Sequence, residues 1–527
     1  MTPSSAEVTL TIEGRRVTVP AGTSILEAAK TVGVLIPHYC YHPGLPVAGV
    51  CRMCLVEVEK APKLAPACAT AVAEGQVVHV HSESARKARQ GVLEMLLINH
   101  PLDCPICDQS GECELQDYTY MEGPPGSRYR EPKRFNPVED FGGDVLYVPN
   151  RCILCTRCVR FMEEVAQDPV LNVSERGDRA YIGLFEGREL IHPWSGNVVD
   201  LCPVGALLSK DFLNKARAWE LDRTASICTG CSQGCNIMIE TRDNVVVRLR
   251  PRPNHEVNGF FMCDYGRLNY RWLNRQDRLE VPAVSSAQGY QPVDWDVALD
   301  GAAAILRGKR VFVLASPDLS NEALYLLSTL AARSGGGGAF RVATGPEAPL
   351  PGVANLALRA DRAANARGAA LVGFERSDTP LADLRSGDAL VVADHELSGD
   401  DRLHAARASA LVFLGTVVPQ DLPKAHVLLP MANYAEEEGT FTNCQGRVQR
   451  YLQARAAPGL ARPAWWILSD LLQRLGHSVA ASQPSDVFAL LAANHPAFAG
   501  LSYASLGLKG QLAVAEEEPL AVVEVQR

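Results

Sequence analysis

The chain has 527 residues, which is long for one domain, and a prior of about 150 residues per domain suggests three or four units. Apolar residues make up 47% of the chain and can bury real cores, so wholesale disorder is excluded. The formal net charge of −9 and the lack of any Lys/Arg block disfavour a nucleic-acid partner.

No window of the sequence approaches about eighteen unbroken apolar residues, so we expect no membrane-spanning helix. The start MTPSSAEVTL lacks the basic and apolar regions of a secretory signal and the Arg-rich pattern of a transit peptide. These features predict a cytosolic protein. In that setting thiols stay reduced, and Cys-x-x-Cys pairs indicate metal or redox chemistry rather than disulfides.

Fifteen of the sixteen cysteines lie between Cys40 and Cys263, and with one histidine they form four groups of four potential ligands. Each group contains a short Cys-x-x-Cys loop, which places two thiolates on one side of a metal centre while a distant ligand closes the other. Structural zinc sites also take four cysteine-rich ligands and are the alternative. The unequal loop lengths favour iron–sulfur clusters over zinc.

The first segment predicts a small sheet with one helix. Residues 8–20 form two short alternating runs around Glu13-Gly14, which is typical of a β-hairpin. Thr23 or Ser24 can cap a helix that runs to Lys30.

The loop that follows this helix has the spacing Cys40-x10-Cys51-x2-Cys54, and Cys68 comes after thirteen more residues. A plant-type ferredoxin has a similar three-cysteine loop, but its first gap is four residues long. The longer gap resembles the ferredoxin module at the front of respiratory and hydrogenase electron-transfer subunits. We assign a 2Fe–2S cluster to this first group: Cys40, Cys51, Cys54 and Cys68. We expect His38 and His42 on the loop surface rather than among the ligands.

The second group follows a predicted helix over residues 84–99, whose apolar residues have helical spacing. Its three cysteines leave one ligand position vacant, and imidazole can ligate iron, as it does in Rieske centres. The rival fourth ligand is Cys444, which lies in another predicted domain, so we favour His100 on loop geometry. The predicted ligands of this 4Fe–4S cluster are His100, Cys104, Cys107 and Cys113.

The third group follows residues 121–146, a stretch rich in Pro, Gly and charge that we interpret as a connector laid over a surface. A bacterial ferredoxin run would place a fourth cysteine at the position of Met162, followed by proline. That cysteine reappears as Cys202-Pro203, so the three-cysteine run and this remote cysteine should share one 4Fe–4S cluster. Its predicted ligands are Cys152, Cys155, Cys158 and Cys202.

The fourth group opens another domain and brackets a predicted hairpin, with alternating runs on either side of residues 242–244. Four thiolates again suit a 4Fe–4S cluster. Its predicted ligands are Cys228, Cys231, Cys235 and Cys263.

From about residue 278 the pattern alternates between strands and helices, which predicts an α/β unit with a mainly parallel sheet. The predicted elements are strands within 309–316, 388–397 and 410–418, and a helix from Asn321 to Arg333. Gly335 to Gly338 lacks the Lys-Ser/Thr of a phosphate loop, so we expect a flexible loop there. The chain has no G-x-G-x-x-G, and we expect Cys444 to be a buried small hydrophobe.

The order of these motifs resembles the large iron–sulfur subunit of respiratory complex I, NADH:quinone oxidoreductase. The fourth group and the tail segments LPMANYAEEEGTFTNCQGRVQRY and PGLARPAWWIL resemble molybdopterin oxidoreductases, a fold that this complex I subunit also carries. The resemblance covers essentially the whole chain, most specifically residues 38–263. The fourth cluster occurs in only some bacterial members of that family.

The resemblance implies a multidomain α+β and α/β fold in which a β-grasp ferredoxin comes first and a truncated molybdopterin-oxidoreductase-like α/β domain comes last. The expected domains are a 2Fe–2S ferredoxin type at 1–83, a one-histidine-three-cysteine 4Fe–4S module at 84–123, a 4Fe–4S ferredoxin-like module at 124–220, a 4Fe–4S molybdopterin-oxidoreductase type at 221–277 and the truncated domain at 278–527.

Two departures from molybdopterin enzymes bear on the tail. It is short for an enzyme that must hold two dinucleotide cofactors, and Tyr265 stands where those enzymes have a lysine near the last cluster cysteine. No cysteine lies between Cys263 and Cys444 to hold the metal, although a serine ligand stays open. We expect a tail without molybdenum, kept for architecture after the loss of its cofactor.

The implied function is electron transfer, as a subunit of NADH:quinone oxidoreductase, a translocase. Electrons would enter from a flavoprotein subunit that binds NADH and FMN and leave towards quinone-side iron–sulfur subunits. The implied location is the cytoplasmic face of the bacterial inner membrane, reached through the complex. The alternatives are a molybdopterin-dependent formate dehydrogenase-like enzyme, the electron-transfer subunit of an NAD-linked hydrogenase, and a zinc-binding interaction module.

Overall fold

The computed structural model describes residues 6–514. The start of the chain, in which we expect no targeting signal, therefore lies partly outside the described residues. The chain forms two compact units, which are described separately. Unit 1 comprises residues 1–221 together with 350–354, and it contains the first three cysteine groups. Unit 2 comprises residues 222–349 and 355–527, and it contains the fourth group.

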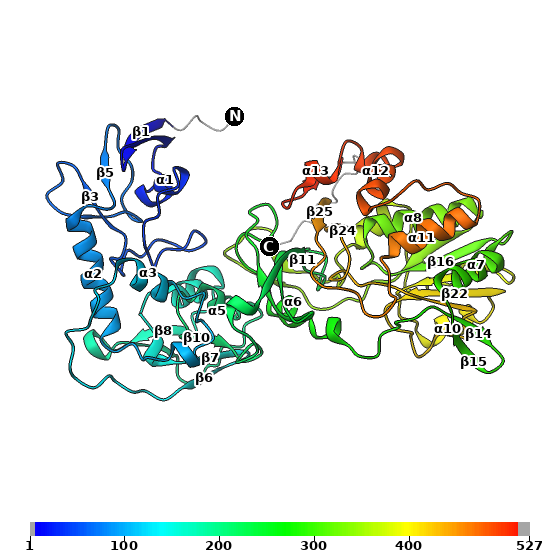
Figure 1. Ribbon diagram of the computed structural model, residues 1–527, viewed down its shortest axis with the longest axis horizontal. Helices are drawn as coiled ribbons and strands as arrows, with labels where there is room; N and C mark the ends of the chain where they lie inside the picture. Colours follow the sequence, from blue (N-terminus) through cyan, green and yellow to red (C-terminus); the bar gives the residue numbers. More distant parts are fainter. Residues whose placement is uncertain (1–5, 515–527) are drawn as a thin grey trace, which may run out of the picture. The chain divides into compact units, whose positions relative to one another are not determined.

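Unit 1 begins with a five-stranded sheet in the order β2-β1-β5-β3-β4, in which β1 pairs antiparallel with β2 and parallel with β5 (Figure 1). Its elements are β1 (Glu7–Ile12), β2 (Arg15–Pro20), α1 (Ile25–Thr31), β3 (Leu55–Val58), β4 (Ala65–Pro66) and β5 (Val77–His79). The predicted hairpin is confirmed, and its turn residues Glu13 and Gly14 both have positive φ. Ser24 caps α1 by accepting a hydrogen bond from the Glu27 N–H at 3.2 Å. A mixed sheet with one helix packed against it is the expected β-grasp arrangement.

Two helices follow, α2 (Glu83–Leu97) and α3 (Glu114–Glu122), and the first confirms the helix predicted over 84–99. The fully buried Arg89 joins them through an ion pair with Glu122 at 3.0 Å. The expected connector runs over this surface. Its Lys133 donates to the carbonyls of Leu97 at 2.7 Å and Ile98 at 3.0 Å. These carbonyls lie at the C-terminus of α2, where a positive charge is stabilising.

The remainder of unit 1 consists of short strands and helices around the third cysteine group. A three-stranded sheet has the order β10-β7-β6, and β8 pairs with β9. The elements are β6 (Glu139–Gly142), β7 (Val145–Tyr147), α4 (Arg157–Arg160), β8 (Leu171–Ser174), β9 (Tyr181–Leu184), α5 (Asn197–Leu201) and β10 (Leu207–Ser209).

Unit 2 begins with the antiparallel sheet β11-β12-β13, formed by β11 (Asp222–Ile227), β12 (Asn236–Arg242) and β13 (Val245–Pro251), followed by α6 (Asp264–Leu268). The predicted hairpin is confirmed. Asp243 and Asn244 have φ of 51° and 64°, and two central residues with positive φ are the condition for the tight hairpin turn that matches strand twist.

The α/β part of unit 2 is built on an eight-stranded sheet in the order β15-β14-β23-β22-β21-β16-β17-β20. The strands are β14 (Ala283–Ser286), β15 (Gly289–Pro292), β16 (Val311–Ala315), β17 (Gly337–Phe340), β20 (Glu375–Arg376), β21 (Ala389–Ala393), β22 (Ala410–Gly415) and β23 (Val427–Pro430). All pairs from β23 to β20 are parallel, and the edge hairpin β14–β15 is antiparallel, so the expected mainly parallel sheet is confirmed.

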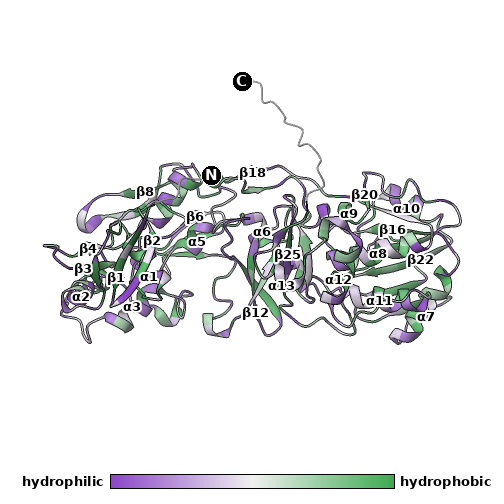
Figure 2. Ribbon diagram, turned by 90° about the horizontal axis from the view of Figure 1, so that it is seen from above, coloured by the Kyte–Doolittle hydropathy of each residue, from purple (hydrophilic) through white to green (hydrophobic). Residues whose placement is uncertain are grey.

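Both faces of this sheet are buried. Along β16, Val311 and Val313 pack into the core formed with α7 (Trp295–Leu306), α8 (Asn321–Arg333) and α11 (Ala464–Arg474). Phe312 and Leu314 pack into the core on the other face, which includes residues of α10 (Gly399–Ala405). Figure 2 shows the resulting hydrophobic colour of β16 and β22. Strands buried on both faces are continuous apolar runs, which is why they could be predicted from sequence.

Smaller elements complete unit 2. A three-stranded sheet is formed by β24 (Gly439–Thr442), β25 (Arg447–Tyr451) and β26 (Gln511–Leu512). The others are β18 (Ala348–Pro349), β19 (Ala357–Leu358), α9 (Ala366–Leu371), α12 (Pro484–Asn494) and α13 (Tyr503–Leu506). Within residues 6–514, no helix combines the length and apolar character needed to cross a membrane.

The expectation of a flexible loop at Gly335–Gly338 was wrong. Gly337 and Gly338 open strand β17 and pair in parallel with Phe312 and Val313 of β16. A Cβ at Gly338 would lie 2.5 Å from the Phe374 ring, and one at Gly336 would collide with the Val311 carbonyl. The glycines allow the chain to approach its neighbours closely rather than to move freely.

Candidate iron–sulfur centres

The four residues of the first group meet in one buried loop region. The Cys40 thiol contacts those of Cys51 and Cys68, and Cys54 contacts Cys68. The Cys40 N–H donates to the Cys51 sulfur at 3.5 Å, a contact that stabilises negative charge on sulfur. Arg52 has φ of 58°, so the left-handed backbone there turns the Cys51-x-x-Cys54 loop tightly.

The two histidines of this loop are half-buried, so the expectation of a surface position was wrong. The His38 Nδ1 is 2.8 Å from the Ile36 carbonyl, and the Gly44 N–H donates to the His42 Nδ1 at 3.1 Å. Burial, together with the positive charges of Arg157 and Lys30, lowers the pKa of His42 to about 3. Both rings therefore support the loop backbone as neutral groups.

The second group is gathered at the start of α3. Cys113 is the N-cap residue of this helix, and the thiols of Cys107 and Cys104 lie close enough to raise its pKa, after burial, to about 11. Cys107 is buried, whereas Cys104 is exposed. A Cβ at Gly205 would lie 2.2 Å from the Cys107 Sγ, so this position leaves room for the sulfur only as glycine.

His100, the predicted fourth ligand of this group, is half-buried and has one unpartnered ring nitrogen. Its Nδ1 is buried and has no hydrogen-bond partner among the described residues, which leaves that nitrogen's lone pair or proton unsatisfied. Burial lowers the pKa of His100 to about 4, helped by Lys133 and Arg151, so the ring is in the neutral form that can ligate a metal. Arg151 also pairs with Asp103, next to Cys104, at 2.8 Å.

The rival ligand Cys444 lies in unit 2, where its N–H donates to the Ser232 carbonyl at 2.8 Å, beside Cys231 of the fourth group. It is half-buried, so its expected place in the apolar core was wrong. Burial raises the pKa of its thiol, and the nearby charge of Arg359 opposes that rise.

We expect His100→Ala to remove one cluster EPR signal and about four iron atoms per chain, because a 4Fe–4S cluster would lose its fourth ligand. The measurement is EPR together with iron analysis of the full chain purified without oxygen. Cys444→Ala is the matched control and should leave every signal intact. The opposite pattern, with a signal lost in Cys444→Ala only, would reverse the assignment.

The third group encloses a cavity whose walls include Cys152, Cys155, Cys158 and Cys202 together with apolar residues. Leu154 and Thr156 have φ of 53° and 60°, so left-handed residues alternate with cysteines and coil the loop around this space. The Leu154 N–H donates to the Cys152 sulfur at 3.4 Å. Met162, at the position of the missing local cysteine, is fully buried, and the remote Cys202 takes its place beside the cavity.

In the fourth group all four cysteines are buried, each at most 6% exposed. Cys228 follows β11 and its N–H donates to the Cys235 carbonyl at 2.8 Å, while Cys263 caps α6 by accepting from the Gly266 N–H at 3.3 Å. A Cβ at Gly266 would lie 2.8 Å from the Cys228 Sγ. Burial raises the pKa of Cys228 to about 12, so metal binding would have to displace its proton.

Among residues 6–514, no three His, Cys, Asp or Glu side chains are placed to hold a single metal ion. An iron–sulfur cluster differs from such a site because it spreads its cysteines around several iron atoms. The residues present fit clusters in three respects: the sulfurs are gathered, they accept backbone N–H groups, and glycines leave space beside them.

Unit 2 also contains a cavity of about 610 Å³ that sequence reasoning missed. It lies at the carboxyl ends of the parallel strands, where ligands bind in open α/β folds. Its walls include Asp318 after β16, Asp394 and His395 after β21, Thr416 after β22 and Met431 after β23. The sequence signal that could have found it is the polar residue directly after three of these strands: Ser316, Asp394 and Thr416.

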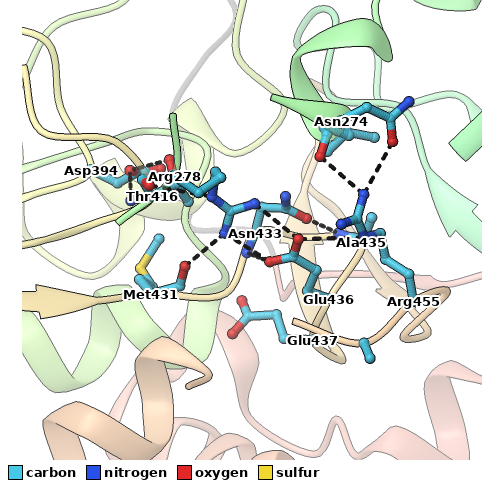
Figure 3. A network of polar contacts seen from close by, with 12 residues as sticks. Asn274, Arg278, Asp394, Thr416, Met431, Asn433, Ala435, Glu436, Glu437 and Arg455 are labelled. Carbon is cyan, nitrogen blue, oxygen red and sulfur yellow. Dashed lines mark hydrogen bonds and ion pairs between the residues drawn. The ribbon is translucent and has the colours of Figure 1, made fainter. Parts of the chain in front are cut away.

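A buried ion-pair network stabilises one wall of this cavity (Figure 3). Arg278 donates to both carboxylate oxygens of Glu436 at 2.9 Å and to the Met431 carbonyl at 3.1 Å. Arg455 lies 3.5 Å from the same carboxylate.

Tyr265 stands where molybdopterin enzymes have a lysine. The Arg362 guanidinium lies 4.9 Å from the centre of its ring, and Arg362 lines the cavity.

Glu437, in the same wall, should make the stability of unit 2 depend on pH. Burial raises its pKa from 4.5 to about 8, so in the folded chain it stays protonated while the unfolded carboxyl ionises. Its contribution to the free energy of unfolding should therefore fall as pH rises from about 4.5 to about 8. Urea titrations of wild type and Glu437→Gln at several pH values check this. The variant should lose part of the pH dependence, and identical pH profiles would contradict the assignment.

Five family models match successive parts of the chain. In chain order they are a 2Fe-2S iron-sulfur cluster binding domain (residues 5–83), the NADH-ubiquinone oxidoreductase-G iron-sulfur binding region (89–128), the NADH-quinone oxidoreductase subunit 3 ferredoxin-like domain (142–208), the molybdopterin oxidoreductase Fe4S4 domain (221–275) and molybdopterin oxidoreductase (402–474).

Curated relatives include the mitochondrial 78 kDa subunit of NADH-ubiquinone oxidoreductase from Candida albicans, 47% identical over 301 residues. That alignment covers 57% of this chain and 42% of the relative. An NADH-quinone oxidoreductase subunit from Rickettsia bellii is 40% identical over 331 residues, covering 62% of this chain and 48% of the relative. Over these residues the chain is homologous to subunits of NADH-quinone and NADH-ubiquinone oxidoreductase. It spans less than half the length of these curated relatives.

A solved structure is also similar to part of the chain. A chain of the NAD+-reducing [NiFe]-hydrogenase in the H2-reduced state is 30% identical and covers 40% of this chain and 91% of its own length, with a TM-score of 0.35. The family models confirm the predicted order of ferredoxin-type modules followed by molybdopterin-oxidoreductase-type segments. The number of clusters and their ligands stay predictions.

Proposed function

We propose that the chain is the electron-transfer iron–sulfur subunit of an NADH:quinone oxidoreductase. The observation that carries the proposal is the order of the cysteine-bearing modules, which matches successive iron–sulfur family models of complex I subunits and molybdopterin oxidoreductases. A chain built this way relays electrons, while oxidation of NADH and reduction of quinone take place on partner subunits.

The proposed groups are one 2Fe–2S cluster and three 4Fe–4S clusters on the sixteen residues assigned above. When bound, they supply the one-electron redox chemistry, with potentials that the protein sets through charge, hydrogen bonds to sulfur and burial. The chain contributes the thiolates and one imidazole, the backbone N–H groups that contact Cys51, Cys152, Cys228 and Cys263, and the apolar walls that exclude water.

The proposed partners are a flavoprotein subunit that binds NADH and FMN on the donor side and iron–sulfur subunits on the quinone side. The proposed place is the cytoplasmic face of the bacterial inner membrane, reached through the assembled complex. The tail of unit 2 is proposed to serve as architecture without molybdenum.

The test is iron, sulfide, zinc and molybdenum analysis of the chain purified without oxygen, with EPR of the complex reduced by NADH. We expect about fourteen iron atoms per chain and cluster signals that NADH reduces. Zinc in place of iron would contradict the proposal. One molybdenum or tungsten atom per chain would favour a formate dehydrogenase-like enzyme, and a nickel-containing partner would favour a hydrogenase subunit.

A further inference from the structure

Helix α4 of unit 1 is only four residues long, yet it contains Cys158 and two arginines that are almost completely buried. Arg157 is 4% exposed and Arg160 is 8% exposed. Buried cations are rare without specific partners, because taking a charge out of water costs several kcal/mol. The partners of these two arginines therefore indicate what the helix does.

Arg157 contacts a residue adjacent to a predicted ligand in each of the first three groups. Its Nη2 donates to the carbonyl of Tyr41, which follows Cys40, at 2.8 Å. Its Nη1 donates to the carbonyl of Leu201, which precedes Cys202, at 3.2 Å. The two nitrogens also donate to the carboxylate of Glu114, which follows Cys113, at 3.1 and 3.2 Å.

Within the described residues, two other arginines of the same segment each contact only two of the three groups. Arg160 donates to the carbonyls of Cys40 and Cys155, and so joins the first and third groups. Arg151 donates to Asp103, the residue before Cys104, at 2.9 Å. Arg151 itself directly precedes Cys152, so it joins the second and third groups. The described contacts of Arg157 reach all three groups.

Arg157 keeps its positive charge in this buried place. The guanidinium of arginine is not deprotonated in proteins, and the Glu114 carboxylate pairs with it at 3.1 Å. A fixed cation in a medium of low dielectric favours the reduced form of each nearby centre, because reduction adds a negative charge. The planar guanidinium of Arg157 donates hydrogen bonds in several directions at once, and it therefore also fixes the positions of the loops that it joins.

We propose that Arg157 is a positioning residue that sets the spacing of the first three centres and raises the reduction potential of all three. The inference rests on the proposed function, since it concerns the clusters assigned there. The proposed role differs from a merely structural one in a measurable way. Removing the charge of Arg157 must change the reduction potentials of the three centres even when no iron is lost.

The test is an EPR-monitored redox titration of the complex containing the full chain, with Arg157→Gln. We expect the three signals of unit 1 to shift to lower potential. A tenfold change in the reduction equilibrium of a one-electron centre corresponds to about 59 mV. Arg157→Lys keeps the charge, so its three potentials should stay close to those of the wild type, although the chain should be less stable to urea. An equal shift in the lysine and glutamine variants would contradict the role of charge.

Matched variants separate local from general effects. Arg160→Gln should shift the first and third signals most, and Arg151→Gln the second and third. Arg188→Gln removes a half-exposed arginine of unit 1, paired with Asp168 at 2.5 Å, and should shift none. If Arg157→Gln loses its iron, Glu114→Gln tests the same contact, because an unopposed Arg157 should raise the potential of the second centre. An unchanged potential in that variant overturns the inference.

The outcomes distinguish the two proposals. Wild-type complex that lacks these cluster signals contradicts the proposed function. Wild-type signals at full strength, with potentials that Arg157→Gln leaves unchanged, contradict only the role of Arg157.

Discussion

Arg278→Met should lower the free energy of unfolding of unit 2 by about 3 kcal/mol. The side chains of Arg278 and Glu436 are 3% and 0% exposed, so removing the cation leaves a buried carboxylate that has lost its two-point partner. Arg455 at 3.5 Å and the Asn433 N–H at 3.0 Å remain, which places the effect at the lower end for a broken buried pair. Urea unfolding of the anaerobic full chain, followed by tryptophan fluorescence, measures it.

The control for this prediction is Arg376→Met, which breaks a pair with Asp361 at 2.7 Å whose arginine side chain is half exposed. That variant should lose at most about 1 kcal/mol, because exposed pairs contribute little. The double variant Arg278→Met/Glu436→Leu should be more stable than the single one, since the buried carboxylate is gone and Arg455 keeps its hydrogen bonds to the Leu273 carbonyl and the Asn274 side chain at 3.1 Å. Equal losses in Arg278→Met and Arg376→Met would contradict the importance of the buried network.

Gly205→Ala should remove the second centre while leaving the other clusters of unit 1 in place. The new Cβ would lie 2.2 Å from the Cys107 Sγ and 3.1 Å from the Gln109 Cβ, so the sulfur would have to leave its position. The expected result is a loss of about four of about fourteen iron atoms and of one EPR signal. Iron analysis and EPR after anaerobic purification measure both.

Gly91→Ala is the matched control. Gly91 lies in helix α2, and a Cβ there would meet nothing within 4 Å. This variant should keep all its iron and gain about 0.5–1 kcal/mol of stability, because alanine is the better helix former. Full iron and an intact second signal in Gly205→Ala would show that Cys107 can move or that it is not a ligand.

Local elements could be predicted where short-range chemistry decides them. Ser24, one of the two predicted caps, caps α1, and α8 begins at the predicted Asn321. The Asp243-Asn244 turn adopts the positive φ values that its residues tolerate. The strands of the parallel sheet were visible as apolar runs. Gly335–Gly338 could not be predicted, because the reason for those glycines is a distant ring, Phe374, that only the folded chain brings near.

The candidate sites divide in the same way. Cysteine spacing indicated which residues could share a centre, because a two-residue gap limits how far apart two sulfurs can lie. The half-buried state of His38 and His42, the place of Cys444 and the cavity of unit 2 depend on contacts across long sequence separations. No local pattern records such contacts.

By itself the sequence determined the module order and the local turns and caps, since the motifs, turns and caps are read from residues that are close along the chain. It predicted the four ligand sets. Only the tertiary structure decided what surrounds them: Gly205 against Cys107, Arg278 against Glu436 and Arg157 against Tyr41, Glu114 and Leu201. The physical reason is that burial and charge pairing act through space, and folding brings together partners that lie tens or hundreds of residues apart.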